Sequence, residues 1–216
     1  MSQRVLILFV HPALEKSKAG RALGRAVRGL DGVTFRDLYE EYPDFAIDVQ
    51  REQQLLLEHD IVVFQHPFYW YSSPALLKEW QDQVLEHGWA YGHGGEQLKG
   101  KSLLTAITAG GRREAYRRGG YNHFTVHELL TPYEQTARLC GMHYLPPFVV
   151  HGTGHLDAEG LEQHAAEYRA LIEKLVSGYD MTTCPRSYAN RDDDSWEDSG
   201  RTPKSDPYSV ELHGGR

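Results

Sequence analysis

The chain has 216 residues, of which 40% are hydrophobic and 25% charged, as is typical of a globular protein with one core. Its longest apolar runs, such as Val5–Val10, are far shorter than the ~20 residues that cross a bilayer, and no signal-peptide pattern opens the sequence. The net charge of −7 argues against a nucleic-acid-binding protein, and two cysteines exclude a disulfide framework and a four-thiolate metal site. We therefore expect a single-core cytoplasmic protein that binds no nucleic acid.

Five short apolar segments predict five β-strands. The first, Val5–Val10, is apolar without interruption, which is typical of a strand buried on both faces. The other four are Val33–Leu38, Ile61–Gln65, Ser102–Thr108 and His143–Val150, and the last carries two prolines near its start.

A helical pattern follows each strand. We expect helices over residues 17–29, 48–58, 74–87, 125–140 and from residue 157 onward. Asp48 and Asp157 are expected to be N-caps, and Ser73 is expected to cap a helix with Pro74 in its first position. The buried face of the last helix is predicted to comprise Leu161, Ala165, Tyr168, Ile172 and Leu175.

Strands that alternate with helices predict a parallel sheet covered on both faces, with ligands at the carboxyl ends of the strands. We place this core at residues 1–176. From Ser177 to Arg216 the chain has eight acidic and five basic side chains and few aliphatic ones. Such a segment buries too little apolar surface to offset the entropy of ordering it. We expect residues 177–216 to be a flexible polar tail, with an arm that wraps a partner as the alternative.

Three segments that follow strands carry candidate ligand-binding groups at one edge of this sheet. Residues 11–20 run into a helix N-terminus, whose free amides favour a phosphate, although taken alone the simpler interpretation is a loop with Ser17 as N-cap. Residues 68–71 are four consecutive aromatics, which cannot all point into a core and are better explained as a wall for a flat ligand, with one or two packed under the next helix. Residues 108–111 end in paired glycines, which either expose backbone amides to a ligand or form a turn.

Together these segments resemble those of the flavodoxin-like NAD(P)H:quinone oxidoreductases, above all the ancillary flavoproteins of Kef-type potassium-efflux transporters. The strings that carry the resemblance are His11-Pro12, residues 66–71 (HPFYWY), residues 87–95 (HGWAYGHGG), residues 108–111 (TAGG) and residues 145–148 (LPPF). The resemblance covers residues 1–176. It implies a flavodoxin-like three-layer α/β sandwich with a five-stranded parallel sheet in the order 2-1-3-4-5.

The resemblance implies a non-covalent FMN, which takes a hydride from NADPH or NADH and passes two electrons to a quinone in a ping-pong reaction. The first loop would hold the phosphate and ribityl chain, the aromatic segment would line the isoalloxazine, and the paired-glycine segment would meet its pyrimidine side and N5 region. Gly20 departs from the pattern, because many relatives have asparagine there. The cofactor-binding residues so assigned are His11, Ser17, Lys18, Ala19, Gly20, Phe68, Tyr69, Trp70, Tyr71, Thr108, Ala109, Gly110 and Gly111.

The resemblance also implies that Tyr116 is catalytic, with a hydroxyl that donates to the developing quinol oxygen. Some quinone reductases have a histidine six residues later; here that position is Asn122, and His123, which follows it, is either a partner of Tyr116 or a solvated loop histidine. The segment around Tyr91 and His93 implies a homodimer in which these two residues complete the site of the other subunit. The alternative is a glycine-rich connection.

Two further functions remain open. The protein is alternatively a regulatory ancillary subunit that binds the cytoplasmic domain of a potassium-efflux transporter at the inner face of the membrane, or a one-electron carrier of the flavodoxin type. Four arginines near Tyr116 form either a solvated loop or a guide for the phosphates of the nicotinamide nucleotide: Arg112, Arg113, Arg117 and Arg118. The histidine pairs 123/127 and 151/155 lack the sequence order or helical context of a zinc site, so we expect no metal.

Overall fold

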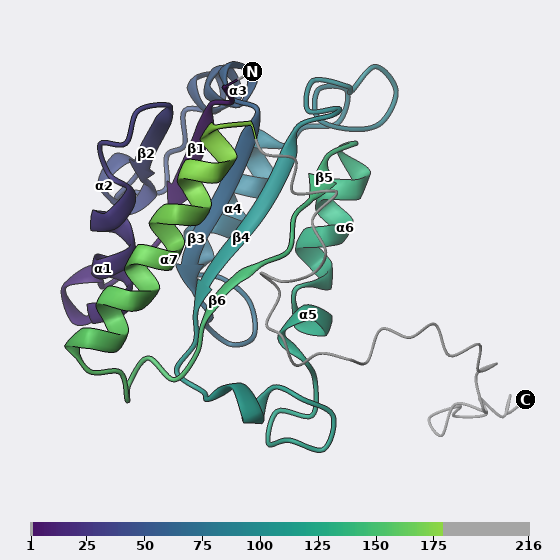
Figure 1. The fold of residues 1–216 in the computed structure, drawn as a ribbon. Coiled ribbons are helices and arrows are strands. Elements are labelled where there is room, and N and C mark those ends of the chain that lie inside the picture. The colour runs from purple at the N-terminus through teal and green to yellow at the C-terminus, as the bar shows by residue number, and fades with distance from the viewer. Residues whose placement is uncertain (1, 179–216) are drawn as a thin grey trace, which may run out of the picture.

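In the computed structural model, which describes residues 2–178, strands and helices alternate along the chain (Figure 1). The strands are β1 (Val5–Phe9), β2 (Val33–Asp37), β3 (Ile61–Pro67), β4 (Ser102–Thr108), β5 (His143–Tyr144) and β6 (Phe148–Val150). The α-helices are α1 (Lys18–Val27), α2 (Leu38–Glu41), α3 (Val49–Glu58), α4 (Ala75–Val84), α5 (Val126–Leu129), α6 (Thr131–Leu139) and α7 (Ala158–Val176), and two 3-10 helices are η1 (Leu14–Lys16) and η2 (Arg113–Ala115). From residue 179 onward, the predicted tail lies outside the described residues.

The strands form one parallel sheet in the order β2-β1-β3-β4-β5, as expected. The predicted fifth strand is divided in two: β5 pairs with the start of β4, and β6 pairs with its end. Pro146 and Pro147 lie between them. A proline nitrogen has no proton to donate to a strand ladder, which explains the interruption.

Helices cover both faces of the sheet, and each face has its own hydrophobic core. Val5 and Ile7 of β1 pack with α1 and α7, whereas Leu6 and Leu8 pack with α3, α4 and α6. Figure 1 shows α1 and α7 on one side of the strands and α4 on the other. The buried residues of α7 are Tyr168, Leu171, Ile172 and Leu175, while Leu161 and Ala165, which we expected to be buried, are half-exposed.

Two of the three predicted N-caps are observed in the structure, and the third is not. Asp48 accepts from the Arg51 amide at 3.0 Å and Asp157 from the Gly160 amide at 2.9 Å, which confirms both N-caps. The prediction for Ser73 is wrong, because Pro74 occupies the N-cap position and α4 begins one residue later. This helix also ends at Val84, short of the expected His87.

The helix expected over residues 125–140 is broken into α5 and α6 at Leu130. Pro132 follows the break and has no amide proton for the helical hydrogen bond to the Glu128 carbonyl. The Thr131 hydroxyl donates to that carbonyl instead, at 2.8 Å. Among residues 2–178, no helix combines the length and the apolar character that crossing a membrane requires.

Candidate functional site

Main-chain hydrogen bonds tie together the loops at the carboxyl edge of the sheet. The Phe68 amide, just after β3, donates to the Thr108 carbonyl at 2.8 Å. The Ala109 amide, just after β4, donates to the Val150 carbonyl at 2.8 Å. The segments predicted to form a site therefore lie side by side, and the loop after β6 joins them at the same edge (Figure 1).

The loop after β1 orients two side chains at the start of α1. The Ser17 hydroxyl oxygen accepts from the Gly20 amide at 3.0 Å, so Ser17 is the N-cap of α1. Nδ1 of the buried His11 ring accepts from the Ala13 amide at 3.1 Å. Burial lowers the pKa of His11, so the ring is neutral near pH 7 and carries its one proton on Nε2. Each side chain therefore retains one donor for a ligand.

The first turn of α1 adds main-chain donors. The amides of Lys18 and Ala19 belong to this turn and have no carbonyl partner within the helix. A Cβ atom on Gly20 would lie 2.8 Å from Ser17 Oγ and 3.3 Å from His11 Cδ2, so glycine at this position makes room for the cap and the imidazole. Together with the positive end of the helix dipole, this donor set suits a phosphate group.

The consecutive aromatic residues form a tight, strained turn after β3. The Ser72 amide donates to the Tyr69 carbonyl at 2.9 Å, and the residues between them, Trp70 and Tyr71, have φ angles of 50° and 61°. Both angles are positive, as in a type I′ turn, although such turns favour glycine and asparagine. Strain of this kind is concentrated at ligand-binding sites. The Trp70 side chain is 93% exposed, so it contributes nothing to the core.

The remaining aromatic rings form a row along the same edge. The ring of the half-buried Phe68 lies 6.3 Å from that of Tyr71 and 6.0 Å from that of Tyr116, measured between centroids. The rings of His11 and Tyr69 lie 6.1 Å apart. Phe68 is thus the member of the aromatic segment that packs inward, and it links the turn to the predicted catalytic tyrosine.

The loop after β4 folds Tyr116 back onto the paired glycines. The Tyr116 side chain lies against the Gly111 backbone, and burial raises the pKa of Tyr116 above its ordinary value. A Cβ atom on Gly111 would lie 3.0 Å from this hydroxyl, whereas one on Gly110 would meet nothing within 4 Å. The missing side chain of Gly111 therefore makes room for Tyr116, and the backbone of Gly110 is left open to a ligand.

Comparison with known proteins identifies the family. Residues 3–172 match a protein family whose members have a flavodoxin-like fold. The chain belongs to this family. The uncharacterised NAD(P)H oxidoreductase YrkL of Bacillus subtilis is 48% identical over 162 residues, which are 75% of this chain and 93% of YrkL. KefG of Serratia proteamaculans, an ancillary protein of the glutathione-regulated potassium-efflux system, is 50% identical over 170 residues, which are 78% of this chain and 93% of KefG.

Solved structures of similar proteins give the same fold. General stress protein 14 of Treponema denticola, solved in complex with FMN, has a TM-score of 0.76 and 39% identity, with 80% of this chain and 99% of that chain covered. An NADPH-quinone reductase of P. pentosaceus has a TM-score of 0.71 and 33% identity, with 78% of this chain and 96% of that chain covered.

Two predicted site residues of this flavodoxin-like chain lie away from the carboxyl edge. Tyr91 and His93 belong to the connection between α4 and β4, which leads into the amino end of β4 (Figure 1). The Tyr91 ring packs edge-on against His87 at 5.5 Å, and His93 is exposed. Within the chain these residues and the aromatic turn are at opposite ends of the sheet.

The residues after Tyr116 are placed differently from the family pattern. Asn122, which stands where some quinone reductases have histidine, accepts a hydrogen bond from the Tyr71 hydroxyl at 3.1 Å and so helps to hold the aromatic turn. His123 is exposed and has a φ angle of 61°. Of the four arginines, Arg118 pairs with Glu128 at 2.9 Å at the start of α5.

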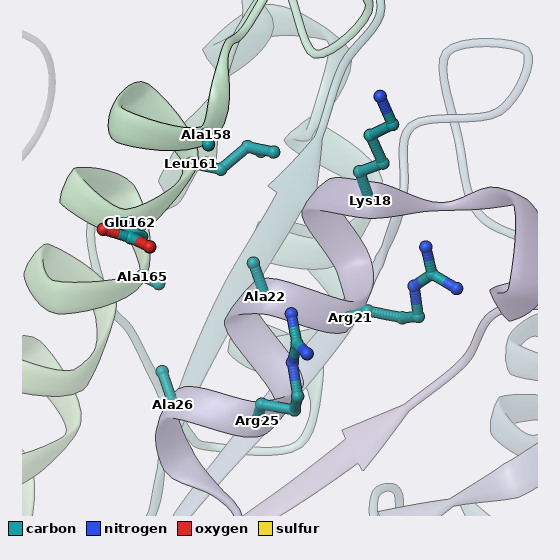
Figure 2. Close-up of a pocket in the computed structure, with 9 residues that line it drawn as sticks. All are labelled: Lys18, Arg21, Ala22, Arg25, Ala26, Ala158, Leu161, Glu162 and Ala165. Atoms are coloured by element: carbon teal, nitrogen blue, oxygen red, sulfur yellow. The ribbon is translucent and has the colours of Figure 1, made fainter.

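A separate groove of about 550 Å³ lies between α1 and α7 (Figure 2). Its floor is mainly alanine side chains, and its lining also includes Lys18, Arg21 and Arg25 of α1 and Glu162 of α7. Because the Lys18 side chain lines this groove, we expect Lys18 to contribute to the phosphate loop through its backbone amide. The aromatic turn and the paired glycines do not line the groove.

Two histidines at the carboxyl edge were not predicted as site residues from the sequence. His66 is fully buried, and its Nδ1 donates to the Pro67 carbonyl at 2.9 Å, at the base of the aromatic turn. His151 follows β6 directly, and its ring lies 5.5 Å from that of Tyr116. His66 belongs to the segment of residues 66–71 that carries the family resemblance, but no local pattern in the sequence pairs His151 with Tyr116.

Proposed function

We propose that this protein is an FMN-dependent NAD(P)H oxidoreductase that reduces a quinone by two electrons in a ping-pong reaction. The observation that carries the proposal is the convergence at one sheet edge of a phosphate-type donor set, an exposed aromatic turn and a paired-glycine loop that seats Tyr116. The YrkL and NADPH-quinone reductase relatives support the reaction class, and the Treponema relative that holds FMN supports the cofactor.

The residues present fit FMN. The His11 Nε2 proton, the Ser17 hydroxyl and the amides of Lys18 and Ala19 would hold the phosphate. The turn formed by Tyr69–Ser72 would line one side of the isoalloxazine, and residues 108–111 would offer backbone groups to its polar edge. When bound, FMN would supply the hydride-transfer chemistry, and the protein would bind, orient and exclude water.

Tyr116 would act on the electron acceptor. Its hydroxyl lies beside the Gly111 backbone, and it would donate its proton to a quinone oxygen as that oxygen gains negative charge. Burial raises the pKa of Tyr116, which keeps the hydroxyl protonated at neutral pH. The exposed Arg112 and Arg117 would attract the phosphates of NADPH or NADH.

We further propose that the active unit is a homodimer. Tyr91 and His93 lie at the sheet edge opposite to the aromatic turn, so they would complete a site only in trans. A two-fold dimer would contain two such shared sites.

A second candidate function is supported by the relative KefG, an ancillary protein of a potassium-efflux system, at 50% identity. In that case the protein would bind the cytoplasmic domain of a potassium-efflux transporter, and both functions would coexist in one chain. Coexpression with a transporter that is encoded next to this protein, followed by co-purification, would test the second function.

The first experiment is to purify the protein, supply FMN, and record its visible spectrum and its oxidation of NADPH and NADH with and without a quinone. We expect a yellow protein whose nucleotide oxidation accelerates when a quinone is added. A protein that stays colourless in excess FMN would overturn the proposal. Bound FMN with one-electron transfer only, and no quinone-dependent turnover, would instead indicate a flavodoxin-type carrier.

A further inference from the structure

The groove between α1 and α7 exposes apolar surface that the two helices do not bury against each other (Figure 2). Leu161 and Ala165 of α7 are half-exposed there, and so are Ala22 and Ala26 of α1. Alanine methyl groups are too short to fill the space between two helices. An apolar side chain from elsewhere would therefore be removed from water on this floor.

The groove is a preformed feature of the fold. Leu23 of α1 and Ile172 of α7 are buried in the same hydrophobic core, which fixes the helix pair. At one end of the groove, Arg169 Nη1 of α7 donates to the Ala26 carbonyl of α1 at 3.1 Å. Glu173 pairs with the Arg169 Nε at 2.9 Å and so orients the guanidinium. The width of the groove is thus set by packing and by a hydrogen bond between the two helices.

A row of cations lines the groove along α1. Lys18, Arg21 and Arg25 are three and four residues apart, so they share one face of the helix, and all three are exposed. None of them forms an ion pair within residues 2–178. Among the described residues that line the groove, Glu162 is the one acidic side chain. The groove therefore suits a ligand that carries several carboxylates beside an apolar group.

The sequence of the chain contains such a segment. Residues 192–198 (DDDSWED) carry five carboxylates around Trp196, the one tryptophan after residue 178. Thirteen residues lie between Gly178 and Asp192, and a chain of that length spans up to about 45 Å when it is extended. The return path along α7 from Val176 to Leu161 is only about 22 Å, at ~1.5 Å per residue. The segment can therefore reach the groove of its own chain.

We propose that residues 192–198 dock in the groove between α1 and α7 of the same chain, with their carboxylates on the row of cations and the Trp196 indole on the alanine floor. The proposal goes beyond the proposed redox function and depends on neither FMN nor a quinone. Because the segment is tethered, its effective concentration at the groove is on the order of millimolar, so individually weak exposed ion pairs suffice. The aromatic turn and the paired glycines do not line the groove and would stay accessible.

Paramagnetic relaxation enhancement in NMR tests the contact in the full chain. A nitroxide is attached to Ser195→Cys in a Cys184→Ser background, since the remaining Cys140 is buried. We expect the nitroxide to broaden the amide signals of the residues on the groove floor, and to leave sharp those of α4 and α6, which cover the other face of the sheet. Equal broadening of the two sets, or none, would overturn the proposal.

Charge reversal tests whether docking depends on the row of cations. Arg21→Glu with Arg25→Glu should reduce the broadening at the groove roughly tenfold, and reversing residues 192–194 to lysine in the same chain should restore it. The matched control, Lys78→Glu with Arg138→Glu, reverses two exposed cations of α4 and α6 and should leave the broadening unchanged. Thermal unfolding checks that each variant is folded. Similar broadening in the groove variant and in the control would contradict the proposed pairing.

Isotope mixing identifies the chain that supplies the segment. Isotope-labelled chains without a nitroxide are mixed, under subunit exchange, with unlabelled chains that carry it. Docking within one chain predicts sharp groove signals in the labelled chains. Broadening of these signals would show that the groove takes the segment of a second copy, and it would overturn the proposal of docking within the chain.

Discussion

His66 shows how one buried residue supports the aromatic turn without taking part in the chemistry. Its Nδ1 donates to the Pro67 carbonyl at 2.9 Å, and the Tyr69 amide donates to the same carbonyl at 3.0 Å. Nε2 has no hydrogen-bond partner within residues 2–178. Burial lowers the pKa of His66 to about 4, so the ring is neutral at physiological pH and fixes the carbonyl on which the turn begins.

The protonation of His66 should therefore be linked to acid stability. The unfolded chain binds the proton near pH 6.5 and the folded chain only near pH 4, so the contribution of the neutral ring is complete above pH 6.5 and is lost as the pH falls through this range. We expect wild type to lose on the order of 3 kcal/mol more than His66→Asn across this range, because asparagine retains the donor but does not titrate. Urea unfolding at several pH values measures the difference. If His66→Asn and wild type lose stability in parallel as the pH falls, the folded chain protonates His66 normally and the buried neutral ring is excluded.

Tyr116 is the residue on which turnover with a quinone should depend. We expect Tyr116→Phe to slow reoxidation by quinone by roughly ten- to a hundredfold, because the phenyl ring keeps the packing on Phe68 but has no proton to donate. FMN content and reduction by NAD(P)H should not change. Stopped-flow measurement of the two half-reactions separates these effects, and an unaltered reoxidation rate would show that Tyr116 only covers the site.

At the scale of elements, the turn from Tyr69 to Ser72 holds two bulky residues in a left-handed backbone. Trp70 and Tyr71 have positive φ angles, and Trp70 is 93% exposed, so packing in the isolated subunit does not offset the strain at Trp70. This conformation costs a residue with a Cβ atom roughly 1–2 kcal/mol, whereas glycine adopts it without this cost. Tryptophan thus occupies a position that stability alone would give to glycine, as expected of a ligand-binding element.

The backbone strain at Trp70 predicts which of two substitutions there gives the more stable protein. In the FMN-free protein we expect Trp70→Gly to be about 1 kcal/mol more stable than Trp70→Ala, because only alanine pays for positive φ. Ser72 is the control, since it lies in the same turn without a positive φ angle. There Ser72→Gly should be less stable than Ser72→Ala. Denaturant unfolding measures the free energy of unfolding of the four variants. Equal values for Trp70→Gly and Trp70→Ala would show that the turn relaxes to a conformation without strain.

Most of the elements could be predicted from local sequence because they depend on local patterns. Apolar runs predicted β1, β3 and β4, and N-capping aspartates predicted where α3 and α7 begin. Two of the errors lie where proline removes a main-chain donor within an otherwise regular pattern, at Pro132 and between β5 and β6. The three site loops were also predictable, because parallel strands place their carboxyl ends at one edge.

The partner of Tyr116 could not be predicted in this way. The local sequence points only to residues that closely follow Tyr116, namely Asn122 and His123. The structure instead brings His151 to Tyr116 through the pairing of β6 with β4. Such a contact depends on tertiary structure, in particular on the division of the last strand, which a local pattern does not contain.

At the scale of the whole molecule, the two ends of the sheet carry different parts of the proposed site. The aromatic turn and Tyr116 are at the carboxyl edge, and the connection that carries Tyr91 and His93 is at the other end. That connection is compact: the Gly88 amide donates to the Tyr91 carbonyl at 2.8 Å, and a Cβ atom on Gly95 would collide with the Tyr91 main chain. It is thus a preformed surface element, suited to completing the site of a second subunit.

Complementation between two inactive variants tests the shared site. One variant is Tyr116→Ala, and the other combines Tyr91→Ala with His93→Ala. After subunit exchange, each mixed dimer has one site that carries both lesions and one that carries none, so an equimolar mixture should recover about a quarter of wild-type activity. Thermal unfolding of the second variant checks that the loss of the Tyr91 ring from its contact with His87 has not unfolded the subunit. A monomer by light scattering, or confirmed exchange without recovery, would show that each subunit completes its own site.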